Sequence, residues 1–122
     1  FIAKKELQDF FYNSARGGKI DNLCLQTSLI HYFSAIHGYV NIIGLIDYPF
    51  GLSCTKARVQ DIDFAVKAGC KTVDIVLNHS YIINDDLDLI EKDIRQCQTK
   101  LLPNNLELRV IVDYRIIEDR LV

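Results

Sequence analysis

The chain has 122 residues, of which 49% are hydrophobic and 25% charged, and its formal net charge is −2. This hydrophobic content is too high for a disordered segment and suits one globular domain, which we place over residues 1–122. A small net charge with both signs mixed argues against a nucleic-acid-binding surface or a basic membrane patch. No apolar run approaches the roughly 20 residues that cross a bilayer.

The cysteines do not form a metal or disulfide pattern. Cys24, Cys54, Cys70 and Cys97 are widely spaced and make no CxxC pair, which argues against a zinc site or a disulfide framework. The three histidines also share no metal-ligand spacing. We therefore expect free thiols, no metal and a reducing, cytoplasmic location. Because the chain begins at Phe1 rather than methionine, we expect that residues before it were cut or left out.

Helical and strand periodicities alternate along the chain. Helices are expected over 1–14, from Thr27 or Ser28 to Gly38, over 55–68, from Asn84 or Asp85 to about Cys97, and over 116–122. Strands are expected over 19–26, 40–46, 72–78 and 106–113. Strict alternation at this spacing predicts an α/β fold with a parallel sheet.

Two α/β architectures fit this alternation, a doubly wound open sheet and a closed barrel of the TIM (β/α)8 class. A doubly wound sheet is covered by helices on both faces, whereas a barrel interior can be polar where substrate enters. Three of the four strands carry one polar face, which comprises Asn22, Cys24 and Gln26, then Thr72, Asp74 and Asn78, then Glu107, Arg109 and Asp113. No glycine-rich phosphate loop follows the first strand. The pattern favours a barrel, and because a whole barrel takes about 250 residues, we expect a partial one.

Asp74 is the residue that most needs an explanation. It lies in the middle of a strand whose other face carries Val73 and Ile75, and a buried carboxylate is costly without partners. One interpretation is structural, an ion pair with Arg109 or Lys71. The other is functional, a proton-transfer group in a site.

Four segments together match a known family. They are Leu23-Cys24-Leu25, Tyr48-Pro49-Phe50-Gly51, Ala68-Gly69 followed by Val73-Asp74-Ile75-Val76-Leu77-Asn78, and Arg109-Val110-Ile111-Val112-Asp113. In order and spacing the sequence resembles the deoxyribose-phosphate aldolases, class I aldolases on a TIM barrel, over about half of the family's length. It departs from the family at Thr72 (usually Glu), Arg109 (Lys), Asp113 (Glu) and the pair Tyr114-Arg115 (Thr-Gly).

The resemblance implies strands two to five of the barrel and reversible cleavage of 2-deoxy-D-ribose 5-phosphate to D-glyceraldehyde 3-phosphate and acetaldehyde. It implies Asp74 as a catalytic proton carrier, with Cys24 and Arg109 lining the site. The Schiff-base lysine and the phosphate loops of the family would follow residue 122, and no metal or organic cofactor is implied. A diverged or truncated non-catalytic subunit is the alternative function, and an open flavodoxin-like domain is the alternative fold.

Several other polar residues have a simpler interpretation. We expect Lys71 to be a surface charge and His79 a loop histidine, although His79 follows a strand at the end where catalytic groups collect. Asp47, before the Pro-x-Gly turn, is a further candidate for ligand contact. On a half barrel, we expect Ile43, Val76 and Ile111 to be exposed on the concave face. The open edges should be covered by the rest of the barrel, a second copy or a larger assembly.

Overall fold

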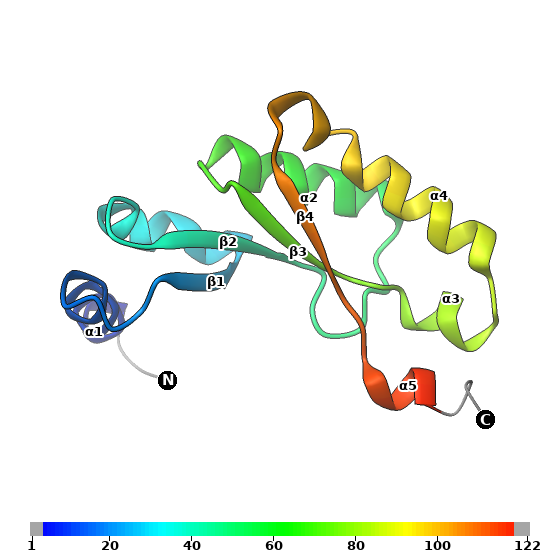
Figure 1. Cartoon of the computed structure of the whole chain (residues 1–122), viewed down its shortest axis with the longest axis horizontal. Coiled ribbons are helices and arrows are strands. Elements are labelled where there is room, and N and C mark those ends of the chain that lie inside the picture. Colours follow the sequence, from blue (N-terminus) through cyan, green and yellow to red (C-terminus); the bar gives the residue numbers. More distant parts are fainter. Residues whose placement is uncertain (1–3, 119–122) are drawn as a thin grey trace.

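The computed structural model describes residues 4–118 (Figure 1). Its four parallel strands lie side by side in sequence order: β1 (Asn22–Gln26), β2 (Asn41–Ile46), β3 (Thr72–Val76) and β4 (Glu107–Ile111). The helices are α1 (Lys4–Arg16), η1 (Thr27–Ile36, 3₁₀), α2 (Thr55–Lys67), α3 (His79–Ile83), α4 (Leu87–Gln98), η2 (Leu102–Asn104, 3₁₀) and α5 (Tyr114–Glu118). The first three residues of the helix predicted over 1–14, and the last four of the one predicted over 116–122, lie outside the described residues.

The strand order separates the two candidate architectures. A doubly wound sheet reverses its strand order at a switch point, so that helices cover both faces. Here the order β1-β2-β3-β4 never reverses, and right-handed crossovers then put the connecting helices on one face. The fold is therefore a partial (β/α) barrel, as the polar strand faces predicted.

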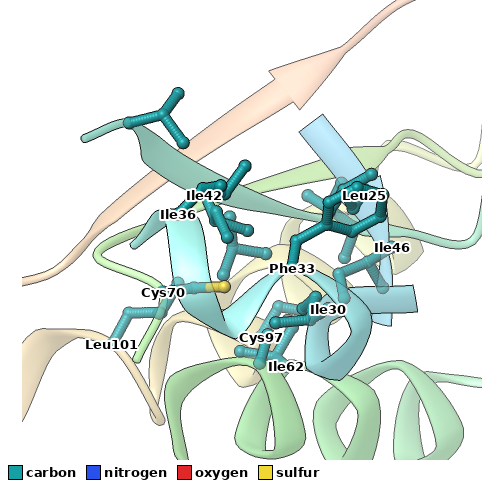
Figure 2. Packing of buried hydrophobic residues seen from close by; sticks show 14 of the residues in the cluster. Leu25, Ile30, Phe33, Ile36, Ile42, Ile46, Ile62, Cys70, Cys97 and Leu101 are labelled. Carbon is teal, nitrogen blue, oxygen red and sulfur yellow. The ribbon is translucent and has the colours of Figure 1, made fainter. Parts of the chain in front are cut away.

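The hydrophobic core lies between that helix-covered face and η1, α2 and α4 (Figures 1 and 2). The strands contribute side chains that the register places on one face, because Leu25 pairs with Gly44, Gly44 with Val73, and Ile46 with Ile75. The helical side contributes Ile30, Phe33, Ile36, Ile62, Ala65, Cys97 and Leu101. The opposite, concave face is left for polar groups.

Gly44 allows β2 and α2 to approach each other closely. A Cβ added at Gly44 would lie 2.8 Å from the Ala65 Cβ, which is closer than carbon atoms pack without strain. Glycine on the strand and alanine on the helix therefore set the distance between the sheet and α2 at this point.

The secondary structure differs from the sequence prediction in three places. The helix after β1 is a 3₁₀-helix with a non-helical residue at Phe33. Its first residue, Thr27, ties it to α2, since the Thr27 Oγ1 donates to the Asp61 Oδ1 at 2.5 Å. A short helix, α3, was not predicted, and the strands are shorter than their predicted ranges, most clearly at β1, which begins at Asn22.

The burial of some apolar residues was also predicted wrongly. Ile43 and Val76 lie on the concave face but are only 3% and 1% exposed, because side chains on the neighbouring strands flank them about 4.8 Å away. Ile111, on the edge strand, is half-buried. Phe10 of α1 and Leu87 of α4 are large apolar side chains that are 64% and 72% exposed.

Candidate active site

Asp74 is held by Arg109 on the concave face. The two residues are direct partners in the β3–β4 register. The Arg109 Nε donates to the Asp74 Oδ1 at 2.7 Å and a terminal nitrogen donates to Oδ2 at 2.9 Å, so the ion pair is bidentate and fixes the plane of the carboxylate. The Asp74 side chain is 12% exposed and that of Arg109 is 51% exposed, which leaves the pair open to the concave side.

Cys24 completes the cluster from two strands away. Its thiol donates to the Asp74 Oδ2 across 3.6 Å. In a flat sheet, strands separated by one intervening strand lie about 9.6 Å apart, so the two side chains converge over β2. Convergence of this kind is what the interior of a barrel requires.

The electrostatics keep the Cys24 thiol protonated. Partial burial, and then the charge and hydrogen bond of Asp74, raise the pKa of the Cys24 thiol to about 11, while Arg109 lowers it by a smaller amount. Since the thiolate is the reactive form, Cys24 is a poor nucleophile near neutral pH. The bidentate Asp74 contact raises the pKa of the Arg109 guanidinium.

The three residues predicted to form the site, Cys24, Asp74 and Arg109, therefore meet in one cluster. The alternative ion pair between Asp74 and Lys71 does not form. Lys71 is exposed, and the partner of Asp74 is Arg109. Asp113 pairs with Arg115 at 2.8 Å rather than with Arg109. Asn78, predicted on the polar face of the strand, instead caps α3 by accepting from the Ser80 and Tyr81 amides.

A second polar cluster, which the sequence analysis missed, lies behind the carboxyl ends of β2 and β3. Arg58 of α2 is 1% exposed and forms ion pairs with Asp47 at 2.8 Å and Asp93 at 3.0 Å. The Asp93 Oδ1 also accepts from the Thr55 hydroxyl at 2.7 Å. Asp47, a candidate for ligand contact, thus has its carboxylate engaged by the protein itself.

His79 is a buried helix residue of the same region rather than a loop histidine. It is 9% exposed and begins the short helix α3. Its backbone N–H donates to the Phe50 carbonyl at 3.1 Å, and its ring packs edge-on against the Phe50 ring with centroids 5.7 Å apart. His79 therefore supports the loop that follows β2.

A cavity of about 540 Å³ lies between the start of η1, the end of β2 and helix α2, lined by residues that include Thr27, Asp47, Ser53, Arg58 and Asp61. Its lining carboxylates, Asp47 and Asp61, outnumber its arginine, which is already paired with two aspartates. A phosphate would find no free cation there, so this cavity is a poor candidate for the substrate's anionic group. Within residues 4–118, no cluster of three or more acidic, histidine or cysteine side chains could hold a metal ion.

Known proteins resemble the chain in both sequence and fold, although no protein-family model matches it. It is 25% identical over 120 residues to the deoxyribose-phosphate aldolase of Mycoplasmopsis pulmonis, covering 97% of this chain and 54% of that protein. It is 32% identical over 87 residues to the deoxyribose-phosphate aldolase of Streptococcus pyogenes, covering 68% of this chain and 39% of that protein. The chain is related to the deoxyribose-phosphate aldolases.

Solved structures of aldolases share the fold. The aldolase QR15 matches with a TM-score of 0.82 at 24% identity, over 96% of this chain and 54% of QR15. A candidate deoxyribose-phosphate aldolase from Coccidioides immitis matches with a TM-score of 0.73 at 18% identity, over 89% of this chain and 43% of that one. The chain spans about half, or less, of the length of the relatives it matches. In the part of the chain that the structure describes, no helix is long and apolar enough to cross a membrane.

Proposed function

We propose that this chain supplies the N-terminal part of a deoxyribose-phosphate aldolase barrel. The reaction is the reversible cleavage of 2-deoxy-D-ribose 5-phosphate to D-glyceraldehyde 3-phosphate and acetaldehyde. It passes through a Schiff base on a lysine outside these 122 residues. The lysine imine acts as the electron sink, so the chemistry needs no metal or organic cofactor.

The observation that carries the proposal is the Cys24–Asp74–Arg109 cluster on the concave face of a chain related to these aldolases. A carboxylate in its ionised form only accepts hydrogen bonds, so Asp74 can take a proton from a bound water or a substrate hydroxyl and return it. Carbinolamine and imine formation require proton transfers of this kind. Asp74 is the catalytic residue in this proposal.

The other two members of the cluster have supporting roles. Arg109 holds both oxygens of Asp74 and adds positive charge near a phosphorylated substrate. Cys24, whose thiol stays protonated, lines the site as a small side chain. The partner is a small sugar phosphate, and the setting is cytoplasmic deoxyribose phosphate catabolism.

A chimera tests the proposal directly. This chain would replace the segment of the Mycoplasmopsis pulmonis aldolase that it matches, so that the remaining parts of that protein complete the barrel, and acetaldehyde release from 2-deoxy-D-ribose 5-phosphate would be measured. We expect turnover from the chimera and none from the isolated 122-residue chain. Borohydride trapping with acetaldehyde should label no lysine in the isolated chain. A folded chimera without turnover would favour a non-catalytic interaction subunit instead.

The Asp74→Asn chimera separates a catalytic role from a structural one. Asparagine keeps the shape and one acceptor oxygen, so the melting temperature should stay close to that of the unchanged chimera. Turnover should fall by roughly 10²-fold or more, the scale of general acid–base catalysis. If the carboxylate were only structural, the melting temperature would fall and turnover would stay near that of the unchanged chimera.

A further inference from the structure

The loop between β2 and α2, residues 47–53, is anchored from the inside by the buried side chain of Arg58 and by the His79 backbone N–H, which donates to the Phe50 carbonyl. The Arg58 guanidinium donates to the Asp47 Oδ2 at 2.8 Å and to the Gly51 carbonyl at 3.3 Å, both in the loop. It also donates to the Val76 carbonyl at 2.7 Å and to the Asp93 Oδ2 at 3.0 Å. One side chain therefore joins the loop, the last residue of β3 and helix α4.

The loop backbone lies directly against the end of β3. Gly51 has a φ of +66°, and a Cβ there would lie 2.7 Å from the Val76 carbonyl oxygen. Asp47 has a φ of +60°, and its carboxylate accepts from the Ser53 backbone N–H and hydroxyl, both at 2.9 Å. The loop is thus tied to Arg58 at Asp47 and Gly51, and it closes on itself at Ser53.

The large apolar side chains of the loop are exposed although its backbone is anchored inward. Tyr48, Phe50 and Leu52 are 56%, 57% and 59% exposed, and their loop follows the carboxyl end of β2 (Figure 1). Substrates of (β/α) barrels bind at this end. Large apolar side chains on an anchored backbone make a preformed wall rather than a mobile flap.

We propose that Arg58 is a positioning residue. It holds the loop as a fixed wall of the substrate site and holds the end of β3 two residues beyond Asp74. The wall borders substrate only if the carboxyl end is the aldolase site, so this part rests on the proposed function. The anchoring itself does not.

The geometry explains why this position carries arginine rather than lysine. The planar guanidinium reaches four oxygens in different directions, whereas an ammonium is a point charge with three donors. Without the cation, Asp47 and Asp93 would be left near each other without a counter-charge, and the Gly51 and Val76 carbonyls would each lose a donor. Lysine should therefore preserve the charge balance but release the loop from part of its anchoring.

Hydrogen exchange on the full 122-residue chain tests the anchoring. The reporters are the backbone N–H groups of Gly51 and Ser53 in the loop and of Ile75 inside β3. Arg58→Lys should speed loop exchange by about tenfold and leave Ile75 unchanged, and Arg58→Met should have the larger effect. Arg95→Met, which removes an exposed arginine paired with Glu91, is the matched control and should change neither.

The outcomes separate positioning from general stability. If loop and strand amides accelerate together in Arg58→Lys, the residue is only a global stabiliser and the proposal is overturned. Unchanged loop exchange in Arg58→Lys also overturns it. Should Arg58→Met fail to fold, Arg58→Lys still decides the question because it keeps the buried charge.

Kinetics of the chimera test the wall. A loosened wall should raise the KM of Arg58→Lys by about tenfold with a much smaller change in kcat, because binding is lost while Asp74 stays in place. An unchanged KM beside a loosened loop would overturn the assignment of the loop to the substrate site. If the unchanged chimera is inactive, the proposed function fails, while the exchange result still decides whether Arg58 anchors the loop.

Discussion

Replacing Asp74 by asparagine should make the Cys24 thiol more reactive in the isolated chain. The Asp74 carboxylate raises the pKa of Cys24 both by its charge and by accepting the thiol hydrogen bond, whereas Arg109 lowers that pKa. Asparagine removes the negative charge and leaves Arg109 without its ionic partner. The substitution therefore removes the Asp74 charge, which raises the pKa of Cys24, and strengthens the effect of Arg109, which lowers that pKa.

The size of the effect follows from the distance between the groups. The thiol sulfur and the carboxylate oxygen are 3.6 Å apart. Two unit charges at about 4 Å interact by about 1 kcal/mol in water and about 4 kcal/mol at the effective dielectric constant near a protein surface. Because the site is open to solvent, we take the lower value. That corresponds to a rise of about fivefold to tenfold in the thiolate fraction.

The assay is the rate of alkylation by iodoacetamide between pH 7 and 9, followed by mass spectrometry in a Cys54→Ser background. Cys54 is replaced because it is exposed, whereas Cys70 and Cys97 are 2% and 0% exposed and should react slowly. Far below a pKa of about 11, the rate follows the thiolate fraction and should rise by about fivefold to tenfold in Asp74→Asn. Arg109→Met should slow the reaction. An unchanged or slower rate in Asp74→Asn would refute the geometry of the cluster.

Two further predictions concern stability. Gly44→Ala should lower the free energy of unfolding by about 1–3 kcal/mol, measured by urea titration, because its Cβ would lie 2.8 Å from that of Ala65. Gly38→Ala, with nothing within 4 Å of its Cβ, is the control and should not destabilise; equal losses in both variants would contradict the packing argument. Arg115 lowers the pKa of Asp113 from 3.8 to about 2, so this pair contributes stability above pH 4 that is lost as the pH falls toward 2. Arg115→Met should return the Asp113 pKa toward 3.8 in a carboxyl NMR titration, and an unmoved titration would show that the ion pair is not the cause.

The partial barrel and its polar cluster could be predicted because both depend on alternation. A period of two places Asp74 and Arg109 on one face of their strands, and parallel neighbours then bring them together. The interpretations of Asp74 as structural and as functional turn out to share one geometry, since the ion pair with Arg109 lies on the face where a substrate would bind. The 3₁₀ geometry of η1 could not be predicted, because its apolar spacing fits an α-helix equally well.

Arg58 was missed because a charged side chain is expected in solvent, although it lies four residues before Ile62 and seven before Ala65, on the buried face of α2. Its burial depends on two carboxylates from other elements, Asp47 and Asp93. The sequence carried a second signal in helix α4. Asp93 comes three residues after Ile90 and four before Cys97, inside the apolar stripe of its helix. It is a carboxylate in a core position, and the reasoning that singled out Asp74 applies to it equally.

The sheet edges lead to a last prediction, about the state of the chain in solution. Within residues 4–118, no further strand pairs with the outer side of β1 or of β4. Val110 of β4 and Val112 just beyond it are 41% and 39% exposed, so one edge combines unpaired backbone groups with apolar side chains. Edges of this kind recruit other strands. We therefore predict that the chain is not a free monomer and that the rest of a barrel, a second copy or a larger assembly covers these edges. Analytical ultracentrifugation of the isolated 122 residues should show self-association, which a charge on the edge strand, Val110→Lys, should weaken more than Leu89→Lys, a change at a similarly exposed (44%) side chain of helix α4. A compact monomer with a cooperative melting transition would show that these edges are stable when open and that the half-barrel does not need completion.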